Sequence, residues 1–309
     1  MKKIWKFLVH HVKEDFNARS YGLIFLFLAA SVYVNYRFDF EDTYLDTQKG
    51  FIKFFAYFLF YGFAYFSALL ILYFSRKGNT FLKNRDFWIR SLLAIGLLSL
   101  DGSQPFLHEA INASFSVQVQ YWTYKVLTNL AGLFFVTIPL LAFHHYYDRR
   151  ENYYYGLRPH QFDTRPYFQL LLLMMPLIIG ASFNDGFLRQ YPMYKVTQAY
   201  TVLGVPEWVT VGIYEAVYGM DFVNVELLFR GFLVIGMIAV LGRQAVLAMA
   251  VTYCYLHFGK PAGEAISSIF GGYILGVVAF ETRSIWGGII VHMGIAWSME
   301  LVAFIQKSL

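Results

Sequence analysis

Four ionisable side chains in the last third of the chain could together do acid–base chemistry. Glu226 and Arg230 stand four residues apart in an apolar stretch, so on a helix the carboxylate and the guanidinium share a face and can pair. His257 and His292 follow near the edges of two later apolar segments. Charged groups at membrane depth are costly and usually face a bundle interior or a wet cavity. The pattern therefore predicts one shared polar site.

The segments that must position these side chains are strongly apolar. The chain has 309 residues, of which 58% are hydrophobic and only 15% are charged, whereas a soluble domain carries roughly 25% charged residues. The apolar residues fall into long runs, which indicates a polytopic membrane protein. The net charge of +5 does not indicate a nucleic-acid partner, because most Lys and Arg lie in a few connections between apolar runs. The single cysteine, Cys254, excludes an internal disulfide and a cysteine-based metal cluster.

A helix needs about 20 mostly apolar residues to cross the hydrocarbon of a membrane. A weaker apolar segment, 199–218, contains Pro206, Glu207 and Glu215 and could span, re-enter or lie flat. With it, the chain predicts an all-α transmembrane helix bundle of about 8–10 spans. The other apolar segments are 21–36, 51–74, 87–100, 117–143, 167–183, 222–241, 245–257, 266–280 and 285–305.

The connections between the apolar segments alternate in charge. Those at 1–19, 76–90 and 144–165 are basic, whereas 37–49 and 101–120 are acidic or nearly uncharged. Basic connections stay in the cytoplasm, so this alternation predicts a cytoplasmic N-terminus. Segment 1–19 mixes Lys with apolar residues and predicts an interfacial amphipathic helix. The polar stretch 149–165 divides one membrane domain into an N-terminal half, 1–165, and a C-terminal half, 166–309, which carries the polar site.

Five short motifs on successive apolar segments resemble, in order and spacing, those of the CPBP family. This family comprises the CaaX-prenyl-protease and bacteriocin-processing membrane proteins, also called Abi. The resemblance covers about 215–297. The motifs are Glu226-Leu-Leu-Phe-Arg230-Gly231, Tyr253-Cys-Tyr-Leu-His257, Gly272-Tyr-Ile-Leu-Gly276, Arg283-Ser-Ile-Trp286 and His292.

The resemblance implies an activity and a division of roles. Family motifs run Glu-Glu-x-x-x-Arg, then Phe-x-x-x-His, then His-x-x-x-Asn. The first Glu and the first His activate a water, and the second His and the Asn steady the negative oxygen of the cleaved carbonyl. The chain is thus expected to be an intramembrane endopeptidase of the bacterial plasma membrane, surrounded by lipid, with a peptide or membrane-protein substrate. No cofactor is required, although Glu226, His257 and His292 could supply three zinc ligands.

The chain departs from the family motifs at two functional positions. Val225 stands where the family has its first, water-activating Glu, and Ala296 stands where the family has its Asn. Tyr253 replaces the family's Phe. The departures support a second hypothesis, a catalytically silent relative that binds or shields a membrane partner protein. A third hypothesis is a transporter that uses Lys125 with the Glu226–Arg230 pair. Inverted repeats would favour this hypothesis, and no such repeat is evident in the sequence.

Another carboxylate could replace the missing one. Glu215 lies eleven residues before Glu226, nearly on the same helix face but about 16 Å away, so it can reach the site only if the chain folds back near Gly219 or Asp221. Otherwise Glu226 must itself be the base. Glu300, two turns beyond His292, is a weaker candidate.

Overall fold

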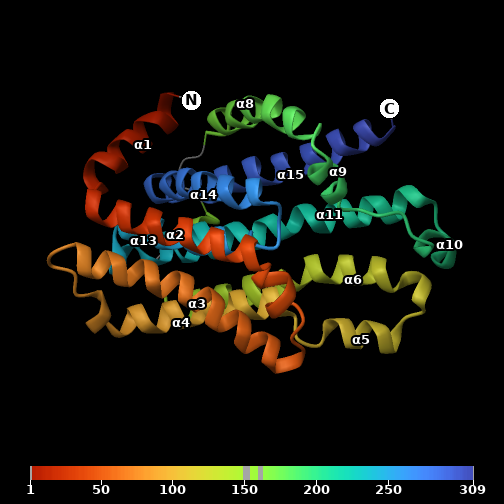
Figure 1. The fold of residues 1–309 in the computed structure, drawn as a ribbon, viewed down its shortest axis with the longest axis horizontal. Coiled ribbons are helices and arrows are strands. Elements are labelled where there is room, and N and C mark those ends of the chain that lie inside the picture. The colour runs from red at the N-terminus through yellow and green to blue at the C-terminus, as the bar shows by residue number, and fades with distance from the viewer. Residues whose placement is uncertain (1, 149–153, 159–162, 309) are drawn as a thin grey trace.

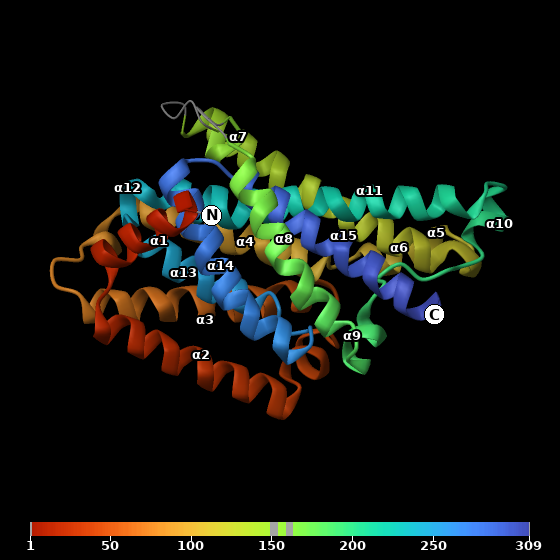
Figure 2. The ribbon, with the colours of Figure 1, turned by 90° about the horizontal axis from the view of Figure 1, so that it is seen from above.

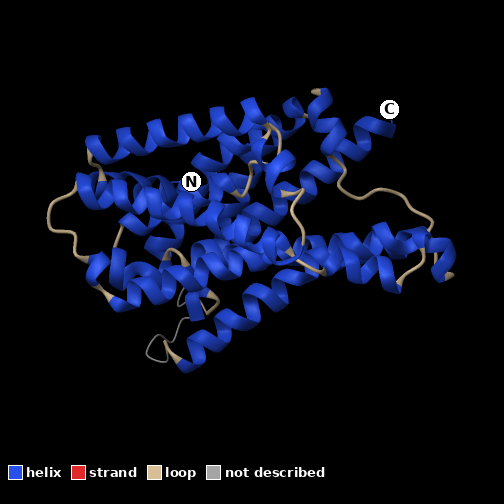
Figure 3. Cartoon of the chain, turned by 60° about the horizontal axis from the view of Figure 1, so that its bottom comes forward, coloured by secondary structure: helices blue, strands red, loops and turns tan. Residues whose placement is uncertain are grey.

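The structure, a computed structural model, describes residues 2–148, 154–158 and 163–308. Within these ranges every regular element is a helix and no strand occurs (Figure 3). The predicted all-α polytopic bundle is therefore confirmed. Among the described residues, six helices are long and apolar enough to cross a membrane: Ala18–Phe38, Gly50–Ser75, Val117–Tyr146, Glu207–Leu241, Ala262–Thr282 and Trp286–Ser308. Two shorter apolar helices, Arg165–Ala181 and Gln244–Tyr255, add to them.

The labels used below follow Figure 1. The major helices are α2 (Ala18–Phe38), α3 (Gly50–Ser75), α4 (Arg85–Ser103), α6 (Val117–Gly132), α7 (Ile138–Tyr146), α8 (Arg165–Ala181), α11 (Glu207–Glu226), α13 (Gln244–Tyr255), α14 (Ala262–Thr282) and α15 (Trp286–Ser308). The shorter ones are α1 (Lys2–Asp15), η1 (Glu41–Leu45), η2 (Phe81–Lys83), α5 (Leu107–Ser114), η3 (Leu133–Thr137), η4 (Tyr154–Gly156), α9 (Asp185–Gln190), α10 (Ala199–Leu203), η5 (Leu227–Phe232), η6 (Ile235–Met237) and α12 (Ile238–Leu241).

The chain does not fold back near Gly219 and Asp221, which was the condition for Glu215 to reach the site. Helix α11 runs unbroken through both residues and continues through η5 to Leu241. Gly219 serves close packing instead, because a Cβ at this position would lie 2.4 Å from the Trp297 ring of α15. Asp221 needs no turn, since Asn224 on the same helix donates to its carboxylate at 3.3 Å. Segments 199–218 and 222–241, predicted separately, thus form one long helix preceded by α10.

Two π-helical segments interrupt the long helices. Segment η3 separates α6 from α7, and η5 follows directly after Glu226. A π-segment holds extra residues in its turn, so it shifts every later side chain around the helix, and such segments are frequent at functional sites. Thr137 of η3 donates to Asn224 of α11 at 2.7 Å. This hydrogen bond ties the two long helices together beside the π-segments.

Close helix contacts set the position of α13 within the bundle. A Cβ at Gly272 would lie 2.9 Å from the Tyr253 ring, and one at Gly276 would lie 2.5 Å from Met249. These two glycines of α14 therefore let α13 approach closely, as small residues do in membrane bundles. Figure 1 shows α8 above α15 on one side of the molecule and the α3–α4 pair on the opposite side.

One buried apolar cluster joins the two halves of the chain. It includes residues of α2, α3 and α4 from the first half and of η5, α13, α14 and α15 from the second. Helix α1 lies against α14 (Figure 2) and is held by polar contacts. Arg76 binds Asp15 at 2.7 Å, and Arg243 lies 3.1 Å from His11. Burial lowers the pKa of His11 to about 4, so this imidazole is neutral near pH 7.

Candidate active site

The site is built around the end of α11. Glu226 is the last residue of this helix, and Arg230 lies within η5. Nη1 of Arg230 lies 2.9 Å from Oε1 of Glu226. Both side chains are fully buried, with at most 1% of either exposed to solvent. Two opposite charges buried together are tolerated because each offsets the desolvation cost of the other. The i,i+4 spacing expected from the sequence thus produces an ion pair in the interior.

A second helix brings an imidazole to the same carboxylate. Nδ1 of His292, on α15, lies 3.2 Å from Oε1 of Glu226. The other ring nitrogen, Nε2, lies 3.1 Å from the hydroxyl of Tyr253 on α13. Because a carboxylate only accepts hydrogen bonds, Nδ1 must carry a proton and donate it. Three helices therefore contribute one chain of hydrogen bonds, from carboxylate through imidazole to phenol.

His257 also contacts Tyr253. Its ring packs against the Tyr253 ring with centroids 4.6 Å apart, and its Nδ1 lies 2.9 Å from the Tyr253 carbonyl oxygen. A carbonyl only accepts, so the neutral ring carries its proton on Nδ1. Nε2 then keeps its lone pair and can accept a proton. The structure thus brings Glu226, Arg230, His257 and His292 together around Tyr253.

The turn that follows His257 is held by the N-terminal half of the chain. Asn35 donates to the Phe258 carbonyl at 3.1 Å, and its own carbonyl accepts the backbone N–H of Glu41 at 3.2 Å. The Tyr36 hydroxyl donates to the Lys260 carbonyl at 2.7 Å and lies 3.4 Å from that of His257. Residues outside the expected family segment therefore fix the end of α13.

The second carboxylate oxygen of Glu226, Oε2, is covered by helix α15. A Cβ at Gly288 would lie 1.9 Å from Oε2 of Glu226, so this oxygen sits directly against the backbone of α15. Within the described residues, Oε2 and the three guanidinium nitrogens of Arg230 are buried without an aligned hydrogen-bond partner. The guanidinium instead lies over the Tyr253 ring, 4.1 Å from its centroid. This cation–π contact offsets part of the cost of burying the charge.

The other carboxylates named from the sequence lie elsewhere. Glu215 stands three turns before Glu226 on unbroken α11, which puts it about 16 Å away along the axis. Glu300 accepts the backbone N–H of Met193 at 2.7 Å and so holds the segment after α9 against α15. Lys125 contacts the Tyr121 ring on its own helix. The structure therefore does not bring Glu215, Glu300 or Lys125 to the Glu226 ion pair.

The two departures from the family motifs put apolar side chains where the family has polar ones. Val225 is half-buried and packs against the main apolar cluster, and Ala296 is buried one turn beyond His292. Among the described residues, no three His, Cys, Asp or Glu side chains are arranged to hold a metal ion. The zinc arrangement considered for Glu226, His257 and His292 therefore gains no support from their positions.

Sequence reasoning missed the hydroxyl of Tyr253 and the contacts of Asn35 and Tyr36. The Tyr253 hydroxyl could have been noticed, because it is the one atom added where the family has Phe. Nothing in the spacing of Asn35 or Tyr36 indicates a contact with residues more than 200 positions later. Such contacts depend on which helices become neighbours, which the chain order does not specify.

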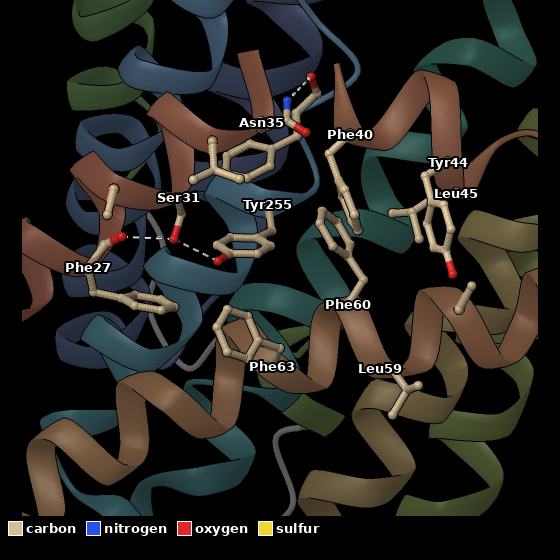
Figure 4. Close-up of a pocket in the computed structure, with 14 residues that line it drawn as sticks. Phe27, Ser31, Asn35, Phe40, Tyr44, Leu45, Leu59, Phe60, Phe63 and Tyr255 are labelled. Atoms are coloured by element: carbon tan, nitrogen blue, oxygen red, sulfur yellow. Dashed lines mark hydrogen bonds between the residues drawn. The ribbon is translucent and has the colours of Figure 1, made fainter. Parts of the chain in front are cut away.

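An apolar pocket of about 640 Å³ opens beside the His257 turn (Figure 4). It lies between α2 and α3, and Tyr255 and Phe258 form part of its wall next to the candidate site. The Tyr255 hydroxyl donates to Ser31 at 2.7 Å, on the pocket side of α13. The two hydroxyls thus have different partners: that of Tyr253 contacts His292, and that of Tyr255 contacts Ser31.

One family model matches the segment of the chain that contains these residues. Residues 222–298 match the model of the Rce1-like family, described as type II CAAX prenyl endopeptidase Rce1-like. The matched segment contains Glu226, Arg230, Tyr253, His257 and His292 and leaves out Glu215 and Glu300. No curated protein and no solved structure matches the chain.

Proposed function

We propose that the chain is an intramembrane endopeptidase, because residues 222–298 match the family model described as type II CAAX prenyl endopeptidase Rce1-like. The observation that carries this proposal is the buried polar array in the matched segment. Glu226, His292 and Tyr253 form a hydrogen-bonded chain, and His257 packs on Tyr253. Burying so many polar groups is costly, and a working site is a physical reason for a membrane bundle to keep them.

His257 is the group best placed to activate water. Its Nδ1 donates to a backbone carbonyl, which fixes the ring and leaves the Nε2 lone pair available. Nε2 takes a proton as the water oxygen bonds to the substrate carbonyl carbon. The same proton then goes to the leaving amine when the C–N bond breaks. Water supplies both new groups, so the reaction needs no further reactant.

Glu226 has a supporting role in this proposal rather than that of the water-activating base. Oε1 faces Arg230 and His292, and Oε2 lies against Gly288, so the carboxylate has no open side for water. Its negative charge orients the His292 ring and stabilises it when protonated. The role that the resemblance gives to the first Glu, replaced here by Val225, therefore passes to His257.

The apolar pocket lined in part by Tyr255 and Phe258 supports a proposal for the kind of substrate. A cavity of about 640 Å³ falls in the range of ligand pockets, and its walls are mostly aromatic and aliphatic. We propose that it accepts an apolar part of a membrane peptide while the peptide bond lies at His257. A prenylated peptide is the first probe to use, given the name of the matching family.

The test uses purified full-length protein in liposomes. A prenylated C-terminal peptide and a mixture of solubilised membrane proteins are incubated with the wild type and with His257→Ala, and the products are identified by mass spectrometry. We expect products that form with the wild type and disappear with His257→Ala. Products formed equally by both would refute the assignment of His257.

A catalytically silent relative remains a distinct candidate, and a specific observation favours it. The carboxylate that the family uses on water is absent at Val225, and Glu226 is enclosed by its partners. A protein of this kind would bind a membrane partner through the same helices. In that case no cleavage product would form, and His257→Ala would leave the cellular phenotype of the wild type unchanged at equal protein levels.

A further inference from the structure

Tyr253 occupies the centre of the candidate site. Its side chain is 4% exposed, and it contacts the other polar residues in different ways. The ring packs on His257 and beneath the Arg230 guanidinium, while the hydroxyl reaches Nε2 of His292. The ring alone would satisfy the packing contacts. The hydroxyl is therefore the part of this residue that needs a separate explanation.

The protonation state of His292 decides which acceptor the Tyr253 hydroxyl donates to. In the resting site, Nδ1 of His292 donates to Glu226, and the phenol O–H donates to the Nε2 lone pair. When the imidazole is protonated, Nε2–H donates to the phenol oxygen instead. The phenol proton is then free to donate elsewhere. Glu226 accepts from Nδ1 in both states and keeps the ring in the same orientation.

We propose that the Tyr253 hydroxyl is a catalytic group that donates a hydrogen bond to the substrate carbonyl oxygen as it becomes negative. The inference rests on the proposed peptidase function and adds a residue to it. The resemblance assigns oxyanion stabilisation to His292 together with an Asn at the position of Ala296, which has no donor. Tyr253 supplies the missing donor from a neighbouring helix.

The reaction step balances with this assignment. The water oxygen bonds to the carbonyl carbon, its proton goes to Nε2 of His257, and the carbonyl π electrons move to oxygen. Before this step Nε2 of His292 takes a proton from solvent and keeps it through the cycle, so that Nε2–H donates to the phenol oxygen and the phenol O–H hydrogen-bonds to the substrate oxygen. When the C–N bond breaks, the electrons return, the hydrogen bond weakens, and His257 protonates the amine. A donor placed for the transition state in this way contributes mainly to kcat.

The central experiment removes only the hydroxyl. Tyr253→Phe keeps the ring that packs on His257 and Arg230, so we expect folded protein with a kcat lowered by about 10²–10³-fold and a KM changed much less, as for loss of one oxyanion donor. The matched control is Thr252→Val, which removes a hydroxyl from the same helix that donates only to the Ala248 carbonyl of that helix at 3.0 Å. We expect the control to retain wild-type kcat.

A second variant tests whether the donor can be moved. Ala296→Asn in the Tyr253→Phe background places an amide one turn from His292, the arrangement that the resemblance describes. We expect part of the lost kcat to return. If either variant fails to fold, 3,5-difluorotyrosine is placed at position 253 instead. This residue keeps the ring and the hydroxyl but makes the phenol more acidic. We expect it to shift the alkaline limb of the kcat–pH profile to lower pH.

The outcomes separate this inference from the proposed function. A wild-type protein that cleaves nothing while His257→Ala leaves the phenotype intact overturns both. The role of Tyr253 is overturned if the wild type is active and Tyr253→Phe has a kcat within twofold of it. An unchanged kcat–pH profile with difluorotyrosine has the same meaning. Either result leaves the peptidase proposal standing.

Discussion

Nδ1 of His292 lies 3.2 Å from Oε1 of Glu226, although 66 residues separate them in the chain. The same oxygen faces Nη1 of Arg230 at 2.9 Å. One carboxylate oxygen thus balances a guanidinium on its own helix and orients an imidazole on another. The buried charge of Glu226 is therefore both a structural element and part of the proposed catalytic array, and variants of each partner separate the two roles.

Removing one member of the ion pair should cost more stability than neutralising the other. Arg230→Ala leaves the Glu226 charge buried and without its partner, which costs about 3–5 kcal/mol. Glu226→Gln keeps the shape and removes the charge, so we expect a smaller loss of stability and a larger loss of activity. Thermal unfolding of the detergent-solubilised variants measures the difference. Equal destabilisation by both would favour a purely structural pair.

Two adjacent glycines of α14 provide a matched test of helix packing. A Cβ at Gly272 would lie 2.9 Å from the Tyr253 ring, whereas one at Gly271 meets nothing within 4 Å. We expect Gly272→Ala to push Tyr253 away from His292 and to lower activity. Gly271→Ala should be neutral or stabilise the helix by about 0.5–1 kcal/mol. Similar activity of both variants would contradict the proposed position of Tyr253.

Glu41 predicts a pH dependence of stability that comes from the connection between α2 and α3. Burial, with added repulsion from Asp46 and Asp42, raises the pKa of Glu41 from 4.5 to about 8. Between these values the folded protein holds a proton that the unfolded chain has released. The stability contribution of Glu41 is therefore fully present below about pH 4.5 and is lost as the pH rises towards about 8.

The variant Glu41→Gln should remove this dependence. We expect its melting temperature to exceed that of the wild type most clearly above about pH 8, where the wild-type carboxylate becomes charged in a buried place. Asp39→Asn, at an exposed position of the same connection, is the control and should follow the wild-type curve. Parallel curves for wild type and Glu41→Gln would show that Glu41 does not carry the effect.

The orientation in the membrane remains a prediction from charge. The basic connections predict that 76–90 and 144–165 lie in the cytoplasm, with 37–49 on the opposite side. Cysteines introduced in place of Lys77, Tyr146 and Asp42 test this prediction. The native Cys254 is buried, so we expect it to give little background labelling. An impermeant thiol reagent should label only the Asp42 variant in intact cells, and labelling of either of the other two would reverse the assignment.

The parts of the fold that the sequence predicts are those set by local composition. Long apolar runs predict helices because only helices and closed barrels satisfy every backbone group in lipid. The pairing of Glu226 with Arg230 follows from i,i+4 geometry. Gly272 and Gly276 likewise predict a close helix contact from their spacing alone. Each of these inferences uses residues on one helix.

The parts that the sequence does not predict arise between helices. Gly219 and Asp221 are residue types at which a helix can break. In the structure the helix continues, because Asn224 donates to the Asp221 carboxylate and accepts from the Thr137 hydroxyl of η3. The Tyr253 hydroxyl and His292 meet across two helices in the same way. Such pairs become visible only when the neighbours of each helix are known.

The contacts of Asn35 and Tyr36 bear on how this protein can be divided. The segment that matches the family begins at residue 222, yet the carbonyls of Phe258 and Lys260 inside it accept hydrogen bonds from α2. A fragment limited to 222–298 would lose these donors from the turn that carries His257. The matched segment thus lacks helix α2, which holds the turn after His257, and we expect a graft of this segment onto another scaffold to need α2 as well.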